Sequence, residues 1–70
     1  MNLRHLRYLA ALAREGNFHR AAESVHISQP TLSAAIRSLE KELGVELVRR
    51  DQRGYQGLSA AGYMVLTRAR

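Results

Sequence analysis

The sequence predicts a single domain that is mainly α-helical and contains one small β-hairpin. Apolar residues recur at helical spacing in four segments, and a residue typical of helix N-caps precedes each segment. A short stretch between the last two segments alternates around a turn instead. With 70 residues and no cysteine, the chain has room for one small core and has no disulfide or cysteine-zinc site to support it.

Two helices are expected in the N-terminal part of the chain. The first begins after Asn2, a residue typical of N-caps, and ends at Gly16, because glycine readily adopts the left-handed conformation that closes many helices. The second begins after Asn17, which is again a typical N-cap residue, and is about two turns long.

The third helix is expected over residues 29–43. Ser28 is its N-cap, Pro30 lies in the first turn, where a missing N–H costs no hydrogen bond, and Gly44 ends it. Its apolar seam advances by four, three and four residues and consists of Leu32, Ile36, Leu39 and Leu43. Three residues, His26 to Ser28, separate this helix from the second one.

A hairpin and a fourth helix are expected after the third helix. Val45, Leu47 and Arg49 alternate with other positions as in a strand, residues 51–54 form a turn, and residues 55–58 return as a second strand. Ser59 caps the last helix, which still continues at the end of the chain. We therefore expect a fragment of a longer protein.

Two helices joined by a three-residue turn form a helix-turn-helix, and a hairpin behind them is a wing. The charge supports nucleic-acid binding, because eleven Lys and Arg against six Asp and Glu give a net charge of +5, and ten of the eleven bases are arginine. Residues 24–36 carry no formal charge unless His26 is protonated. The sequence thus predicts a neutral surface surrounded by arginines, as double-stranded DNA requires.

The neutral surface lies at the start of the third helix, the recognition helix of residues 29–43. Its solvent side carries small groups that suit base edges in the major groove, namely Gln29, Thr31, Ser33 and Ala34. Phosphate contacts are expected around it, with Arg20 and Arg37 on helices and Arg50 in the hairpin. Arg53 is expected to contact the backbone or the minor groove, because Gly54 beside it allows a tight turn to approach the duplex.

Several short motifs lie at fixed distances along the chain. They are Ala21-Ala22, Ile27-Ser28-Gln29-Pro30-Thr31-Leu32-Ser33, Ile36-Arg37, Leu39-Glu40, Leu43-Gly44-Val45-Glu46-Leu47, Arg50 and Leu58-Ser59-Ala60-Ala61-Gly62. From Leu3 to about Arg68 the chain resembles the N-terminal DNA-binding domain of LysR-type transcriptional regulators. The resemblance departs at Val48, where the family usually has Phe, and at Ser59, where Thr is common.

The resemblance implies a winged helix-turn-helix over residues 1–58, followed over residues 59–70 by the start of a linker helix that dimerises. It also implies a bacterial, cytoplasmic regulator that binds double-stranded promoter DNA at the nucleoid, and an effector-binding domain that this chain lacks. The wing of residues 49–57 would contact the backbone or the minor groove. Pro30 would lie close to the bases, and the backbone contacts would extend to Asn17, Phe18 and Ser28.

A homodimer through the last helix is also expected. Tyr63, Leu66 and Ala69 share one face of this helix, and a small domain has little else to cover such a stripe. Two-fold symmetry in the protein would match a pseudo-palindromic DNA site.

Other classes of function fit the sequence less well. His19 and His26 lie about two helical turns apart and lack a close partner ligand, so no metal or other cofactor is expected. Nothing supplies a base and an orienting group around Ser24, Ser28 or Ser33, which argues against an enzyme. A membrane-surface protein would gather its bases on one helix face. A non-specific RNA-binding module remains the alternative, although it would require exposed aromatic residues.

Overall fold

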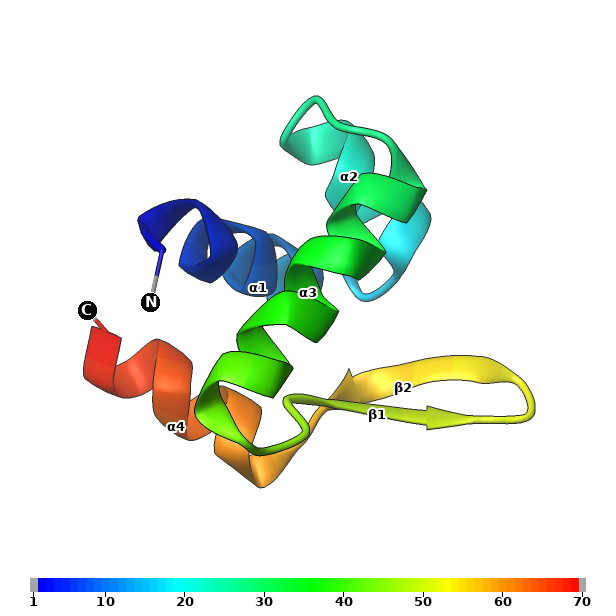
Figure 1. Ribbon diagram of the computed structural model, residues 1–70. Helices are drawn as coiled ribbons and strands as arrows, with labels where there is room; N and C mark the ends of the chain where they lie inside the picture. The colour runs from blue at the N-terminus through cyan, green and yellow to red at the C-terminus, as the bar shows by residue number, and fades with distance from the viewer. Residues whose placement is uncertain (1, 70) are drawn as a thin grey trace.

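The computed structural model describes residues 2–69, and over this range it contains four helices and one two-stranded antiparallel sheet (Figure 1). In chain order these elements are α1 (Leu3–Glu15), α2 (Phe18–Ser24), α3 (Gln29–Leu43), β1 (Val48–Asp51), β2 (Gly54–Leu58) and α4 (Ala60–Ala69). The predicted class, mainly helical with one hairpin, is confirmed.

Each helix begins at the N-cap that the sequence predicts. In every case a side-chain oxygen accepts a hydrogen bond from a backbone N–H of the first turn, which satisfies a donor that the helix itself cannot pair. The four bonds are Asn2 to Arg4 N at 2.8 Å, Asn17 to Arg20 N at 2.7 Å, Ser28 to Thr31 N at 3.2 Å and Ser59 to Gly62 N at 3.0 Å. Helices α1 and α3 end at Gly16 and Gly44, both in the left-handed conformation.

The core lies where α1, α2 and α3 pack together and where the loop before β1 closes over α3. Its most deeply buried large side chains are Leu9, Leu12, Leu32, Ile36, Leu39, Leu47 and Val48. The predicted seam of α3 supplies three of them, and Leu43, the last residue of the seam, is partly buried against the same cluster. Helix α3 therefore has one face fixed in the core, which leaves its opposite face for other contacts.

The connection between α2 and α3 contains a strained residue. His26 has a φ of 60°, in the left-handed region that side chains with a Cβ rarely adopt. The turn is held by two backbone bonds, from His26 N to Glu23 O and from Ile27 N to Ala22 O, each 3.1 Å long. These bonds fix the angle between the two helices.

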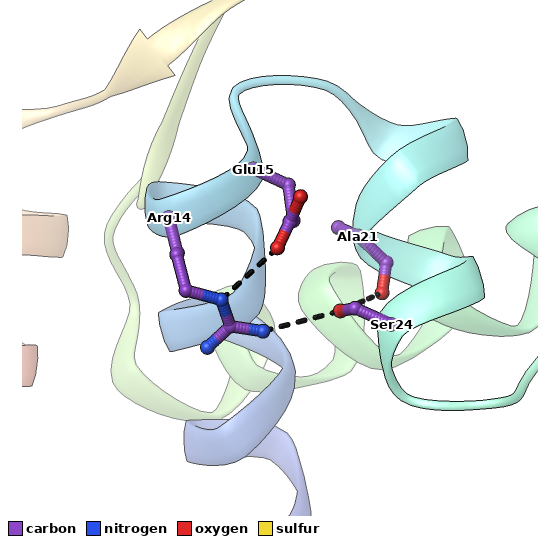
Figure 2. Close-up of polar contacts among 4 residues, drawn as sticks. All are labelled: Arg14, Glu15, Ala21 and Ser24. Carbon is purple, nitrogen blue, oxygen red and sulfur yellow. Dashed lines mark hydrogen bonds and ion pairs between the residues drawn. The ribbon is translucent and has the colours of Figure 1, made fainter.

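A polar bridge joins the ends of α1 and α2 (Figure 2). The Arg14 guanidinium donates to the Glu15 carboxylate at 3.0 Å and to the Ser24 hydroxyl at 3.2 Å. Ser24 in turn donates to the carbonyl of Ala21 at 2.8 Å. The bridge is exposed, so it adds little stability, but it connects two helices at a defined point.

The first strand begins later than the alternation of Val45, Leu47 and Arg49 predicts. Strand β1 starts at Val48, and Leu47 and Val48 are both buried although they are adjacent in sequence. The reason is a carboxylate, because Glu40 on α3 accepts hydrogen bonds from the N–H groups of Leu47 at 2.7 Å and Val48 at 3.4 Å. These bonds hold the segment as a turn against α3, and Val45 remains 44% exposed.

The hairpin contains a β-bulge. Val48 pairs with Leu58 and Arg50 with Tyr55, so the single residue Arg49 lies opposite two residues of β2, Gln56 and Gly57. Gly57 has a φ of 110°, which glycine adopts without strain. A bulge increases the local twist of a hairpin and thus changes the direction in which its tip points.

Helix α4 starts in close contact with the loop before β1. Ser59 donates from its backbone N–H to the Leu47 carbonyl at 2.9 Å and from its hydroxyl to the Glu46 carbonyl at 2.7 Å. Gly62 is buried, and a Cβ there would overlap the carbonyl oxygen of Leu47. This glycine is therefore required for the approach of α4, a reason that the sequence alone does not reveal.

Candidate nucleic-acid interface

The start of α3 presents small neutral groups to solvent. Gln29, Pro30, Thr31 and Ala34 are exposed, while Ser33 is half-buried. Their exposure follows from the core seam, which occupies the opposite face of the helix. None of these side chains carries a charge, so this surface offers hydrogen-bonding and methyl groups alone.

Two hydroxyl groups at this helix start are linked in a chain of hydrogen bonds. The Ser28 oxygen accepts from the Thr31 N–H at 3.2 Å, and the Ser28 hydroxyl donates to the Thr31 hydroxyl oxygen at 2.7 Å. The Thr31 hydroxyl hydrogen then remains to donate outward. Thr31 is in this way oriented by the same residue that caps the helix.

The exposed residues point in different directions around α3. Each residue turns an α-helix by about 100°, so Gln29 and Thr31 lie about 200° apart. By the same rule Ser33 is only about 40° from Gln29, and Pro30 and Ala34 lie between the two flanks, about 40° from each other. The helix start thus has one flank with Gln29 and Ser33, a ridge with Pro30 and Ala34, and a second flank with Thr31.

A groove adjoins the first of these flanks. It has a volume of about 430 Å³ and is lined by Asn17, Phe18, His19, Arg20, Gln29, Arg53 and Tyr55. The structure therefore brings together five of the predicted contact residues from α2, α3 and the hairpin. It does not bring Thr31, Ala34 or Arg37 into this groove, since they lie on other parts of the α3 surface.

The groove has positive walls. Arg20 stands on α2 and Arg53 at the hairpin tip, and both are exposed. Asn17 uses its carbonyl oxygen to cap α2, which leaves its amide group as a donor. His19 also lines the groove and lies 3.7 Å from the Glu23 carboxylate one turn later. An anion between these walls would meet donors from two elements.

The hairpin tip is organised by Asp51. Its carboxylate accepts from the backbone N–H of Arg53 at 2.7 Å and from the side-chain amide of Gln56 at 3.1 Å. The Arg53 side chain is 88% exposed and lies 4.0 Å from the second oxygen of Asp51. The turn is therefore fixed, while the guanidinium extends into solvent.

Three side chains connect the hairpin to α2. The rings of Phe18 and Tyr55 meet edge to face, with centroids 5.3 Å apart and an interplanar angle of 86°. The Arg50 guanidinium carbon lies 5.7 Å from the centroid of the Phe18 ring. Burial, and to a smaller degree the neighbouring Tyr63, raises the pKa of Tyr55, because both disfavour the charged phenolate.

Sequence reasoning missed two residues of this surface. His19 was considered only as a metal ligand, yet it lines the groove. Tyr55 had no assigned role, yet it lines the groove and packs on Phe18. A signal for Tyr55 was available, because a turn over residues 51–54 places Tyr55 opposite Arg50 on the first strand, where cross-strand side chains contact each other.

The predicted dimerisation stripe is divided. Tyr63 is 56% exposed, whereas Leu66 is partly buried against the core of its own chain. Met64, which sequence reasoning did not include, is 54% exposed beside Tyr63. The side chain of Ala69 lies outside the described residues, as does Arg70 at the end of the predicted linker segment.

Within residues 2–69 no three His, Cys, Asp or Glu side chains gather closely enough to hold a metal ion. Over the same part of the chain, no helix has the length and hydropathy needed to cross a membrane.

Comparison with known sequences identifies relatives over the whole chain. Residues 3–63 match the family described as bacterial regulatory helix-turn-helix protein, lysR family. The DNA-binding transcriptional dual regulator OxyR of Escherichia coli K12 is 51% identical over 70 residues, which are 100% of this chain and 23% of OxyR. The Hca operon transcriptional activator HcaR of the same strain is 56% identical over 62 residues, or 89% of this chain and 21% of HcaR. The chain thus spans less than a quarter of these relatives.

Solved structures show the same arrangement. The CbnR DNA-binding domain in complex with DNA superimposes with a TM-score of 0.89 at 43% identity, covering 100% of this chain and 79% of that one. The BenM DNA-binding domain on catB site 1 DNA gives a TM-score of 0.87 at 40% identity, covering 99% of this chain and 76% of that one. A full-length OxyR from Pseudomonas aeruginosa gives 0.89 at 43% identity, covering 99% and 23%. With its helix-turn-helix and hairpin, the chain belongs to the lysR family of bacterial regulatory helix-turn-helix proteins.

Proposed function

We propose that this chain binds double-stranded promoter DNA in a sequence-specific manner. The observation that carries the proposal is the groove in which Gln29, at the start of α3, faces Arg20 on α2 and Arg53 on the hairpin. A neutral hydrogen-bonding group for base edges lies beside two cations for phosphates, which is the division of contacts that duplex recognition uses. The likeness to the CbnR and BenM DNA-binding domains, each solved in complex with DNA, supports the proposal.

The base contacts are assigned to the start of α3, which enters the major groove. Gln29 can donate and accept at once, as the adenine N6 and N7 edge requires. Thr31 offers a hydroxyl hydrogen and a methyl group, which suit a base acceptor or a thymine methyl. Because these two residues lie on opposite flanks, they would contact different base pairs. The remaining residues of the set, on the ridge and the first flank, are Pro30, Ser33 and Ala34.

The backbone contacts surround this reading surface. Arg20 and Arg37 project from helices, and Arg53 would reach the backbone or minor groove from the hairpin tip. The set is completed by the cap residues and the residues of the hairpin contact, namely Asn17, Ser28, Phe18 and Arg50. Phe18 and Arg50 contact each other, so Arg50 is directed by the ring beneath it.

A homodimer through α4 is part of the proposal. Tyr63 and Met64 form an exposed apolar pair on this helix, and Leu66 flanks it while also packing inward. Two copies related by two-fold symmetry would bind a pseudo-palindromic site. A small-molecule effector would act on the domain that the longer relatives have beyond this segment.

Non-specific RNA binding receives no support from the aromatic residues. Stacking of unpaired bases requires exposed rings. Tyr8 is buried, Phe18 and Tyr55 are partly buried against the core, and Tyr63 on α4 is the aromatic residue with more than half of its surface exposed.

Because the proposed function is binding to chromosomal DNA, we assign the protein to the cytoplasm, at the nucleoid, and assign it no catalytic role.

The experiment that tests the proposal is selection of bound sequences from random duplex DNA. The proposal predicts enrichment of one motif in two inverted copies. Recovery of no common motif, with equal affinity for unselected duplex and for single-stranded RNA, would contradict it.

A further inference from the structure

We propose that Tyr55 is a positioning residue for DNA binding. Its ring, packed on Phe18, fixes the direction of the hairpin and thereby places Arg53 opposite α2. The inference rests on the proposed function insofar as it concerns DNA. The contact between hairpin and helix that it assigns is a property of the free protein.

The hairpin needs an external support because two strands alone are marginally stable. Its base is anchored, since Val48 and Leu58 form a register pair and both are buried in the core. Its tip is not, since residues 51–54 are all exposed. The hairpin extends as an arm from the helical body (Figure 1). A support between base and tip therefore decides where the tip lies.

Phe18 provides this support. Arg50 and Tyr55 are a register pair in the middle of the hairpin, and both reach the ring of this one α2 residue. Tyr55 meets it edge to face at 5.3 Å, a geometry that aromatic pairs favour, and Arg50 lies 5.7 Å from its centroid. Each strand thus makes one contact with the same ring, which restricts rotation of the arm about its base.

The position of Arg53 depends on this contact. Its side chain is 88% exposed, and its ion pair with Asp51 spans 4.0 Å, so local bonds hold it weakly. Phe18 follows Asn17 and lies two residues before Arg20, and Tyr55 lies two residues after Arg53. The ring contact therefore fixes the width of the groove between the two arginines.

The first test measures the arm in the free protein. The chain has no cysteine, so Gln52→Cys at the tip and Ser38→Cys on α3 accept spin labels at exposed positions. We expect one narrow distance distribution in the parent and with Tyr55→Phe, which keeps the ring edge. Tyr55→Leu should broaden it. If Tyr55→Leu fails to fold by circular dichroism, Phe18→Leu removes the same ring pair from the other side. An unchanged distribution in a folded variant overturns the inference.

The second test measures coupling to Arg53 on a duplex selected by the parent chain. Arg53→Ala should lower affinity about tenfold in the parent, as expected for a lost charge-assisted contact. It should lower affinity less than twofold in Tyr55→Leu, because the arginine is already displaced. The control is Arg37→Ala on α3, whose loss should be the same in both backgrounds.

The outcomes separate the inference from the proposed function. If Tyr55→Leu binds the selected duplex as the parent does, or if the losses from Tyr55→Leu and Arg53→Ala multiply, the positioning role is wrong while DNA binding stands. If the parent selects no duplex, the proposed function fails, and the spin-label distances still decide whether Tyr55 directs the arm.

Discussion

The hydrogen bond between the Ser28 and Thr31 hydroxyl groups determines which hydrogen-bonding groups remain available at the start of α3. Ser28 donates to the Thr31 oxygen and occupies one of its two lone pairs, so Thr31 presents its hydroxyl hydrogen, one remaining lone pair and its methyl group. Ser28, which caps the N-terminus of α3, thus also orients a residue that would contact a base. Replacement of Ser28 would therefore affect both the helix start and its specificity.

His26 allows a prediction for stability. It has a φ of 60°, which β-branched residues avoid and which Asn tolerates. His26→Val should lower the free energy of unfolding by about 1–2 kcal/mol, and His26→Asn should leave it within about 0.5 kcal/mol. Urea denaturation of both variants measures this. Equal stability of the two variants would show that the backbone conformation costs nothing at this position.

Arg20 and Arg37 allow a prediction for DNA affinity. Since a phosphate contact carries no sequence information, Arg20→Ala or Arg37→Ala should weaken binding to every duplex alike. Each should also reduce the slope of log affinity against log salt by about 0.9. Binding measured over a series of salt concentrations gives the slope. A change of sequence preference at an unchanged slope would exclude the phosphate role of that residue.

At the scale of the elements, Glu40 joins α3 to the hairpin. Its carboxylate accepts the N–H groups of Leu47 and Val48, and Leu47 is fully buried. Glu40→Ala should lower the free energy of unfolding by about 1–3 kcal/mol, since it leaves a buried donor without a partner. The control is Glu46→Ala, an exposed site that removes the same charge. The same midpoint of urea unfolding in both variants would contradict this role.

The local signals of the sequence predicted the helices well. Asn2, Asn17, Ser28 and Ser59 cap four helices through bonds between neighbouring residues, so short-range chemistry suffices. The start of β1 was predicted wrongly because the deciding bond comes from Glu40, seven residues before Leu47. Likewise, the need for glycine at position 62 arises from a carbonyl fifteen residues earlier, at Leu47.

The candidate site was predictable in part for the same reason. The neutral, exposed start of α3 follows from its seam and its cap, which are local. That Gln29 shares a groove with Arg20 and Arg53, and that Tyr55 packs on Phe18, depends on how the hairpin lies against α2. No spacing along the chain contains that information.

At the scale of the whole molecule, the exposed face of α4 predicts self-association. Tyr63 and Met64 are each more than half exposed, and Met64→Glu should weaken a dimer by placing a charge in its interface. Sedimentation should show dimers that increase with concentration in the parent and decrease in the variant. A strict monomer, both free and on a duplex with two half-sites, would exclude the dimer.

In the proposed complex, uncharged side chains at the start of α3 select the DNA sequence. The most direct measurement compares Gln29→Ala with the parent on the selected duplex and on a scrambled one, at two salt concentrations. We predict a loss of about 1–3 kcal/mol on the selected duplex, almost none on the scrambled one, and the same salt slope. Equal losses on both duplexes would show that Gln29 does not select the sequence.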